Sequence, residues 1–188
     1  MPAPTILRDV FLTYRDRHGE EDDGLLFENP SGPVPRLDVF VYRSIEMTTF
    51  ATIGMALHEM PSAPGPGGGG RAELRLVRRG QLSRTDEHAV AVQLANLAVH
   101  PFLTGDQLNW GHMIGLNDEF PTFRGCRSVF LAGPLSPAAL DYVRTSAGAV
   151  RILNVVPITD AERAHGRTLP PLAFAESLLS RRDPYSAP

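Results

Sequence analysis

The residues of 36–44, RLDVFVYRS, alternate with a period of two, which is the period of a β-strand. Leu37, Val39 and Val41 fall on one face, and the other face also carries aromatic residues. A β-branched and aromatic segment, TTFATIGMAL (48–57), follows almost at once. The two stretches therefore predict a β-hairpin.

Residues 71–80, RAELRLVRRG, alternate even more regularly. The pattern places Ala72, Leu74 and Leu76 inward and exposes Arg71, Glu73 and Arg75. We therefore predict a half-exposed antiparallel strand. We interpret its arginines as residues on the solvent-exposed face of the sheet. The alternative is a basic binding surface.

Apolar residues at helical spacing predict a first helix near the N-terminus. Ile6, Val10 and Tyr14 form its stripe, with Thr5 as the expected cap and Gly19 as the expected end. The acidic, Pro- and Gly-rich segment that follows, 20–35, is predicted to be a loop with a solvated acidic run at its start.

The main helix is predicted in SRTDEHAVAVQLANLAVHPF, residues 83–102. Ser83 or Thr85 can cap it, acids occupy its first turn, and Pro101 is expected to stop it. Because residues 89–99 are nearly all apolar, we expect this helix to lie buried across the sheet.

The C-terminal half predicts three further strands and two or three short helices. The strands are expected in 107–116 (QLNWGHMIGL), 127–133 (RSVFLAG) and 149–157 (AVRILNVVP). Ser136 and Pro137 are typical of a helix start, Thr159 and Glu162 form a capping box, and 170–182 reads as the last helix. The whole pattern predicts an α+β fold: a mainly antiparallel (mixed) sheet with helices packed on its faces.

A Pro/Gly-rich stretch, 61–70, interrupts the elements and is predicted to be a flexible loop. Gly65–Gly70 fits the letters of G-x-G-x-x-G, but the dinucleotide motif needs a preceding strand and a following helix N-terminus. Here a predicted strand follows. We therefore expect no nucleotide at this loop.

Length and charge narrow the class of protein. A chain of 188 residues suits one domain, 1–188, that buries roughly 70% of its unfolded surface. The net charge of −3 gives no drive toward nucleic acid or anionic membranes. Neither a signal-like segment nor a membrane span is evident, so we expect a cytoplasmic protein.

No catalytic or metal-binding motif appears among the reactive residues. The six histidines show no metal-ligand spacing, and the single Cys126 is expected to be a small, semi-buried residue. We therefore expect no metal, no cofactor and no catalysis. The alternative is a small hydrolase or transferase that uses His112 with Asp106 or Asp118.

Three parts of the chain form a recognisable order. The first is TGDQLNWGHMIGL after a buried helix, with Gly105, Asp106, Trp110 and His112. The second is 150–179: an apolar strand, a turn with Pro157, a capped helix with Glu162, a Gly break and an apolar helix. The third is TTFATIGMAL with RAELRL, as paired strands before the main helix. In this order the chain resembles the Suppressor of fused (SUFU) family over about 36–180.

The resemblance implies a binding protein of the bacterial single-domain type. The animal member sequesters Gli transcription factors and holds the partner peptide as a β-strand between two domains. Many bacterial members are considered immunity proteins of polymorphic toxin systems. Because the chain has room for one domain, we expect only a strand edge to be retained.

The family's peptide contacts fall nearest the turn LNDEF, which makes Asn117 and Asp118 candidate partner-binding residues, with Trp110 and His112 beside them. We interpret Trp110-Gly111-His112 as a fold signature next to a recognition surface. The expected partner is another protein, such as a toxin domain.

Overall fold

The computed structural model describes residues 3–61, 70–136 and 139–188, and it contains four α-helices and eight strands within them. The helices are α1 (Thr5–His18), α2 (Arg84–Thr104), α3 (Asp160–Gly166) and α4 (Pro171–Arg181), with a 3-10 turn, η1 (Met55–Leu57). The strands are β1 (Asp23–Ser31), β2 (Val34–Arg43), β3 (Met47–Ile53), β4 (Arg71–Arg79), β5 (Met113–Gly115), β6 (Cys126–Ala132), β7 (Tyr142–Thr145) and β8 (Gly148–Thr159).

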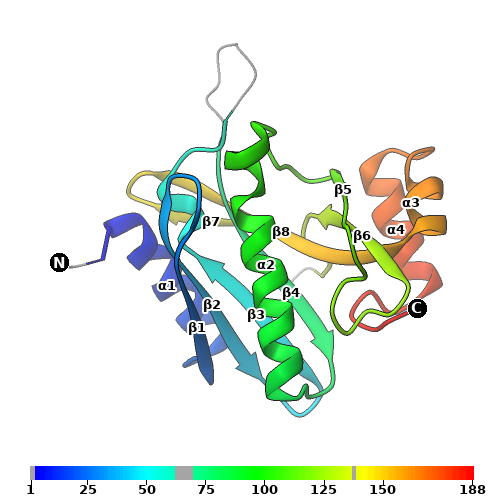
Figure 1. Ribbon diagram of the computed structural model, residues 1–188, viewed down its shortest axis with the longest axis horizontal. Helices are drawn as coiled ribbons and strands as arrows, with labels where there is room; N and C mark the ends of the chain where they lie inside the picture. Colours follow the sequence, from blue (N-terminus) through cyan, green and yellow to red (C-terminus); the bar gives the residue numbers. More distant parts are fainter. Residues whose placement is uncertain (1–2, 62–69, 137–138) are drawn as a thin grey trace.

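The strands form one twisted sheet in the order β1-β2-β3-β4-β8-β6-β5, with β7 paired to β8 beside this path (Figure 1). Only β4 and β8 run parallel, and every other described pair is antiparallel. The predicted α+β class and the mainly antiparallel, mixed sheet are therefore confirmed. The predicted hairpin is the β2–β3 pair, in which Val41 lies opposite Phe50.

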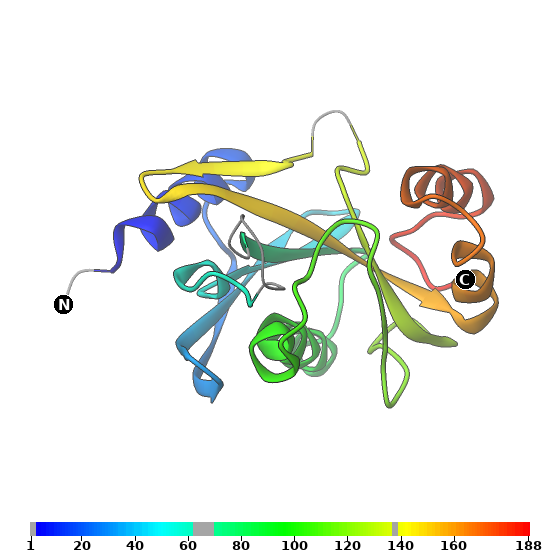
Figure 2. The ribbon, with the colours of Figure 1, turned by 90° about the horizontal axis from the view of Figure 1, so that it is seen from above.

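Helices cover both faces of the sheet (Figure 2). α2 packs across β1 to β4 and forms the larger core with the face that carries Leu37, Val39 and Val41. α1 covers the opposite face near β3 and β7, and its predicted stripe of Ile6, Val10 and Tyr14 is buried there. α3 and α4 lie at the far end, against β6 and β8.

Segment 20–35 was expected to be a loop, but most of it forms the edge strand β1. Its residues pair with β2, for example Leu25 with Val39 and Phe27 with Leu37. Leu25 and Phe27 alternate with exposed residues and pack against the main core. Pairing with a strongly apolar strand thus overrides a composition typical of loops.

The inward and outward faces of β4 also differ from the prediction. Glu73 was expected in solvent, yet it is fully buried, and Arg71 and Arg75 are half-buried. The reason is that α1 and η1 cover the second face of the sheet, so both faces of this central strand are enclosed. In a strand that is covered on both faces, the alternation of apolar and polar residues no longer indicates which side chains are buried.

The predicted helix ends are partly correct. Ser83 caps α2 by accepting a hydrogen bond from the Asp86 amide, and the Thr159–Glu162 capping box is present. Pro101 does not stop α2, because the helix continues to Thr104. A proline close to the end leaves few backbone bonds to disturb.

The remaining corrections are local. Thr5 does not cap α1, since the N-cap residue is Pro4 and has no side-chain bond to offer. The short strand β7 was not expected. The predicted helix start at Ser136–Pro137 and the predicted flexible loop 61–70 lie largely outside the described residues.

Candidate functional site

Trp110 lies in the turn before β5 and holds that turn against the sheet. Its indole Nε1 donates a hydrogen bond to the carbonyl oxygen of Ile152 in β8 at 3.0 Å. Its ring meets Tyr142 edge-on, with centroids 5.3 Å apart, and the Arg151 guanidinium lies 5.4 Å from the indole centroid. A half-buried indole with its N–H satisfied by the backbone acts as a structural anchor.

Position 111 of the Trp110-Gly111-His112 motif requires a glycine. Its φ is +92°, and an added Cβ would lie 2.6 Å from Cγ of Pro171 at the start of α4. Both the backbone conformation and the close approach of α4 therefore require glycine. The predicted strand 107–116 is accordingly wrong in its first half, because the chain turns at Trp110 and pairs only as β5.

His112 is exposed and lines a shallow hollow that also includes Asp106, His100 and residues of β5. The fold thus brings Asp106 close to His112, whereas Asp118 is not part of the hollow. Within the described part of the chain, no hydrogen bond joins His112 to either aspartate. A general base needs such an orienting partner, although hydrogen bonds of this kind can tighten only on substrate binding.

The predicted recognition turn follows β5 directly and is exposed. Asn117 accepts a hydrogen bond at its carbonyl oxygen from Nη2 of Arg127 at 2.8 Å, which fixes the start of the turn. The side chains of Asn117, Asp118 and Glu119 are exposed. Among the described residues, the side chains of Asp118 and Glu119 form no ion pair, and both follow the edge strand β5 directly.

The other residues of the family motif have structural roles. Gly105 ends α2 in the left-handed conformation with φ of +81°, and Asp106 next to it is exposed. The carbonyl oxygen of Pro157 and the carboxylate of Glu162 both accept hydrogen bonds from Arg182. Burial raises the pKa of Glu162, but bonds from Arg182 and Thr159 outweigh it and leave that pKa lowered.

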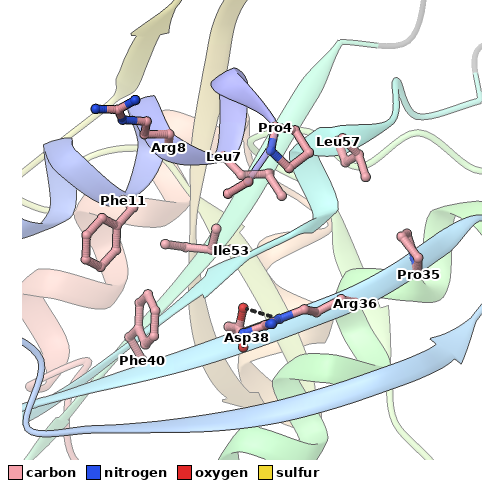
Figure 3. A pocket seen from close by; sticks show the side chains of 11 residues that line it. Pro4, Leu7, Arg8, Phe11, Pro35, Arg36, Asp38, Phe40, Ile53 and Leu57 are labelled. Carbon is pink, nitrogen blue, oxygen red and sulfur yellow. Dashed lines mark hydrogen bonds and ion pairs between the residues drawn. The ribbon is translucent and has the colours of Figure 1, made fainter. Parts of the chain in front are cut away.

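A cavity of about 530 Å³ that no sequence motif indicated lies between α1 and β2 (Figure 3). Phe11, Phe40 and Ile53 surround it, and the Arg36 guanidinium binds the Asp38 carboxylate at its β2 side through two bonds of 3.0 Å. The complete lining is Ala3, Pro4, Leu7, Arg8, Phe11, Pro35, Arg36, Asp38, Phe40, Ile53 and Leu57. Aromatic residues on the second face of 36–44 were the one available signal.

The described residues contain neither a metal-ligand cluster nor a membrane-spanning helix. No cluster of three or more His, Cys, Asp or Glu side chains there could hold a metal ion. None of the helices in these residues is long and apolar enough to cross a membrane. Cys126 is buried, as expected for a small residue without a partner, and burial raises its thiol pKa to about 11.

Comparisons with known proteins point to one family. Residues 33–181 match the family profile described as Suppressor of fused protein (SUFU). No curated protein sequence matches the chain. Among solved structures, the Sufu-Fu complex is similar with a TM-score of 0.64 and 15% identity, over 98% of this chain and 86% of that one.

Drosophila Suppressor of Fused is similar as well, with a TM-score of 0.63 and 15% identity over 96% of this chain. The chain spans 46% of that protein. At this identity the structural likeness concerns the fold, and the family profile carries the assignment. Since the profile covers most of the sequence and the two structures share the fold, the chain belongs to the Suppressor of fused family.

Proposed function

We propose that the protein is a non-enzymatic binding module that sequesters a partner protein, and that it acts as an immunity-type protein against a toxin domain. Membership of the Suppressor of fused family supports the binding role, and one of its structural neighbours is a complex, Sufu-Fu. The immunity role rests on the resemblance to bacterial single-domain members. The observation that carries the binding site is the open edge of β5 beside an acidic turn.

The backbone of β5 is available for strand addition. Ile114 pairs with Val129, and the flanking bonds from the Leu116 amide to Arg127 and from the Leu131 amide to His112 set the alternation. In an antiparallel pair, every second residue directs its N–H and C=O away from its neighbour. Met113 and Gly115 therefore direct these groups toward the open edge, where an extended partner segment can pair with them.

The acidic turn indicates the charge of the partner. Asp118 and Glu119 are exposed immediately after the open edge. Such rim charges steer the association of an oppositely charged surface and add less to the final affinity. A basic partner, such as a nuclease-type toxin domain, fits this arrangement.

Affinity capture from the native cell, with mass spectrometry of the co-purifying proteins, identifies the partner. A large secreted toxin encoded in the neighbouring reading frame would support the immunity role. Recovery of the same partner by the isolated chain in a binding titration is the expected result. Failure of any protein to co-purify and bind directly would contradict the proposal.

Two variants, one on each edge strand of the sheet, locate the interface. Gly115→Pro removes one outward N–H of β5 without removing a bond to β6, a position where edge strands tolerate proline. We expect it to weaken partner binding by about tenfold or more. Leu26→Lys, at the exposed centre of the opposite edge strand β1, is the control and should bind like the parent. The reverse result would move the interface to β1.

The alternative of a small hydrolase or transferase has one favourable observation, the shared hollow of His112 and Asp106. It predicts turnover that His112→Ala stops in a folded protein. The binding proposal predicts that the purified chain turns over no ester, amide or phosphoester substrate. Hydrolysis that disappears in the folded His112→Ala variant would overturn it.

A further inference from the structure

A second cavity, of about 170 Å³, lies between the C-terminal end of α1, β4 and the C-terminal segment. Basic side chains from two elements line it: Arg17 and His18 from α1, and Arg75 from β4. Ser136, Ala139, Leu140 and Tyr185 complete the lining. Among the described residues, no acidic side chain lines it. The cavity is thus small, and its charged lining residues are the two arginines.

Arg75 is a partly buried cation that has no carboxylate partner among the described residues. Its guanidinium is half-buried, and burial lowers its pKa. Its one hydrogen bond in the described residues runs from Nη1 to Oδ1 of Asn154 at 3.2 Å, and no carboxylate there lies within ion-pair distance. The residues outside the description, 1–2, 62–69 and 137–138, carry no carboxylate side chain. A largely enclosed guanidinium is normally paired with a carboxylate, so one that has only an amide partner is a costly arrangement.

The neighbouring groups act on Arg75 in both directions. Tyr185 and Tyr14 raise its pKa, whereas Arg17 lowers it by charge repulsion. His18 beside them has its pKa lowered to about 4 by burial, by Arg75 and by Arg17. Among the described residues, its buried Nε2 has no hydrogen-bond partner, and neither has the hydroxyl of Tyr42, whose ring centroid lies 4.9 Å from that of His18.

A purely structural explanation covers only part of the cluster. Arg17 and His18 lie in the last turn of α1, where cationic groups complement the helix dipole. This does not explain Arg75, which lies in a strand. Glu73, whose charge together with burial raises the pKa of the neighbouring Tyr14, accepts hydrogen bonds from Thr52 and from backbone amides of the turn after β3, and not from Arg75.

We propose that this cavity binds a small oxyanion, with Arg75 as the principal donor and Arg17 closing the site from α1. A guanidinium group offers several N–H donors in a fork that matches phosphate, sulfate or carboxylate oxygens. The cavity has room for a group of that size and not for a nucleotide. The oxyanion comes either from a free phosphate-like ion or from a carboxylate of a polypeptide. The site is independent of the β5 edge.

The test uses the intact chain with two probes, inorganic phosphate and N-acetylglycine, each compared with sodium chloride at matched ionic strength. The side-chain NMR signals of His18 report on the cavity, and thermal melting reports on linkage between binding and folding. We expect one probe to shift the His18 signals saturably and to raise the Tm. The tighter probe identifies the source, phosphate-like ion or polypeptide carboxylate.

Three variants make the result specific. Arg75→Gln should abolish the saturable shift, and Arg17→Gln, on the exposed end of α1, should weaken binding by about fivefold or more. Arg8→Gln, at the other end of α1, should leave binding unchanged. If Arg75→Gln does not fold, the parent and Arg17→Gln titrations decide. No saturable shift with either probe, or equal binding by folded Arg75→Gln and parent, would overturn the proposal.

Discussion

Gly111 shows why a short motif at the residue scale can mark a fold instead of a reaction. Trp110 anchors the turn to β8, and Gly111 lets α4 approach the turn closely. Packing against β8 and α4 therefore accounts for the tryptophan and the glycine of this motif. His112 is exposed, and no packing constraint of this kind applies to its side chain.

Gly111→Ala should reduce the free energy of unfolding by about 2–4 kcal/mol, because it combines a strained φ with a clash against Pro171. Gly105→Ala is the matched control: its φ is similar, but nothing lies within 4 Å of the added Cβ. It should cost about 1 kcal/mol. Urea denaturation of both variants measures the difference. Equal costs would mean that the approach of α4 is unimportant.

Glu73 is a second residue whose role depends on burial. Its carboxylate accepts hydrogen bonds from Thr52 Oγ1 at 2.6 Å and from the Gly54 and Ala56 amides at 2.8 and 2.9 Å, which fixes η1 on the sheet. Burial raises its pKa to about 7, although these bonds act in the opposite direction. The folded state therefore binds a proton more tightly than the unfolded chain does.

Stability should consequently fall as pH rises from about 4.5 to about 7, because the unfolded chain releases the Glu73 proton in this range while the folded protein keeps it. Glu73→Gln keeps the acceptor oxygen and cannot titrate. Relative to this variant, the parent should lose about 1–3 kcal/mol across that range. Denaturant unfolding at several pH values tests this. Parallel pH profiles for the two proteins would show that Glu73 does not titrate in the folded state.

At the scale of elements, α2 is the centre of the main core. Leu94 and Leu97 are 0% and 3% exposed, between the helix and the sheet. Leu94→Ala or Leu97→Ala should each cost about 2–5 kcal/mol in unfolding free energy. Asn96→Ala on the exposed side of the same helix should cost under about 0.5 kcal/mol. Losses below about 1 kcal/mol for both leucines would contradict this role for α2.

Elements with a regular period and ordinary caps were predictable from the sequence. β2, β3, α2 with its Ser83 cap and the Thr159–Glu162 box all follow local rules that the fold does not override. β1 was missed because its strand state depends on its partner β2, which local composition does not show. Glu73 was misplaced for the related reason that a second layer covers its face.

The candidate site was less predictable than the fold. The family resemblance suggested the turn with Asp118, which is exposed, whereas the sequence pattern placed Trp110 and His112 in a strand although the chain turns there. The cavity between α1 and β2 joins residues from three segments of the chain, and the cavity around Arg75 joins residues from four. Such sites arise from packing between elements, which a pattern within one segment does not specify.

At the scale of the whole molecule, the net charge of −3 is small. The positions of the unpaired charged side chains therefore matter more for the attraction of a partner than the total charge does. Seven of the 21 acidic side chains form ion pairs among the described residues; for example, Arg43 binds Glu87 and Asp23, and Arg182 binds Glu162. Asp118 is one of the exposed acidic residues that form no ion pair in the described part of the chain. In the proposed function, its charge steers a basic partner toward the β5 edge.

Asp118→Lys should lower the association rate of the captured partner severalfold at low salt and leave the dissociation rate nearly unchanged, because an exposed rim charge acts on the encounter. The difference from the parent should shrink as salt rises, since screening shortens to about 8 Å at physiological ionic strength and about 3 Å at 1 M. Glu28→Lys, exposed on the opposite edge strand β1, controls for the change in net charge. Surface plasmon resonance at two salt concentrations gives both rates. If Asp118→Lys associates as fast as Glu28→Lys at both, the acidic turn does not face the partner.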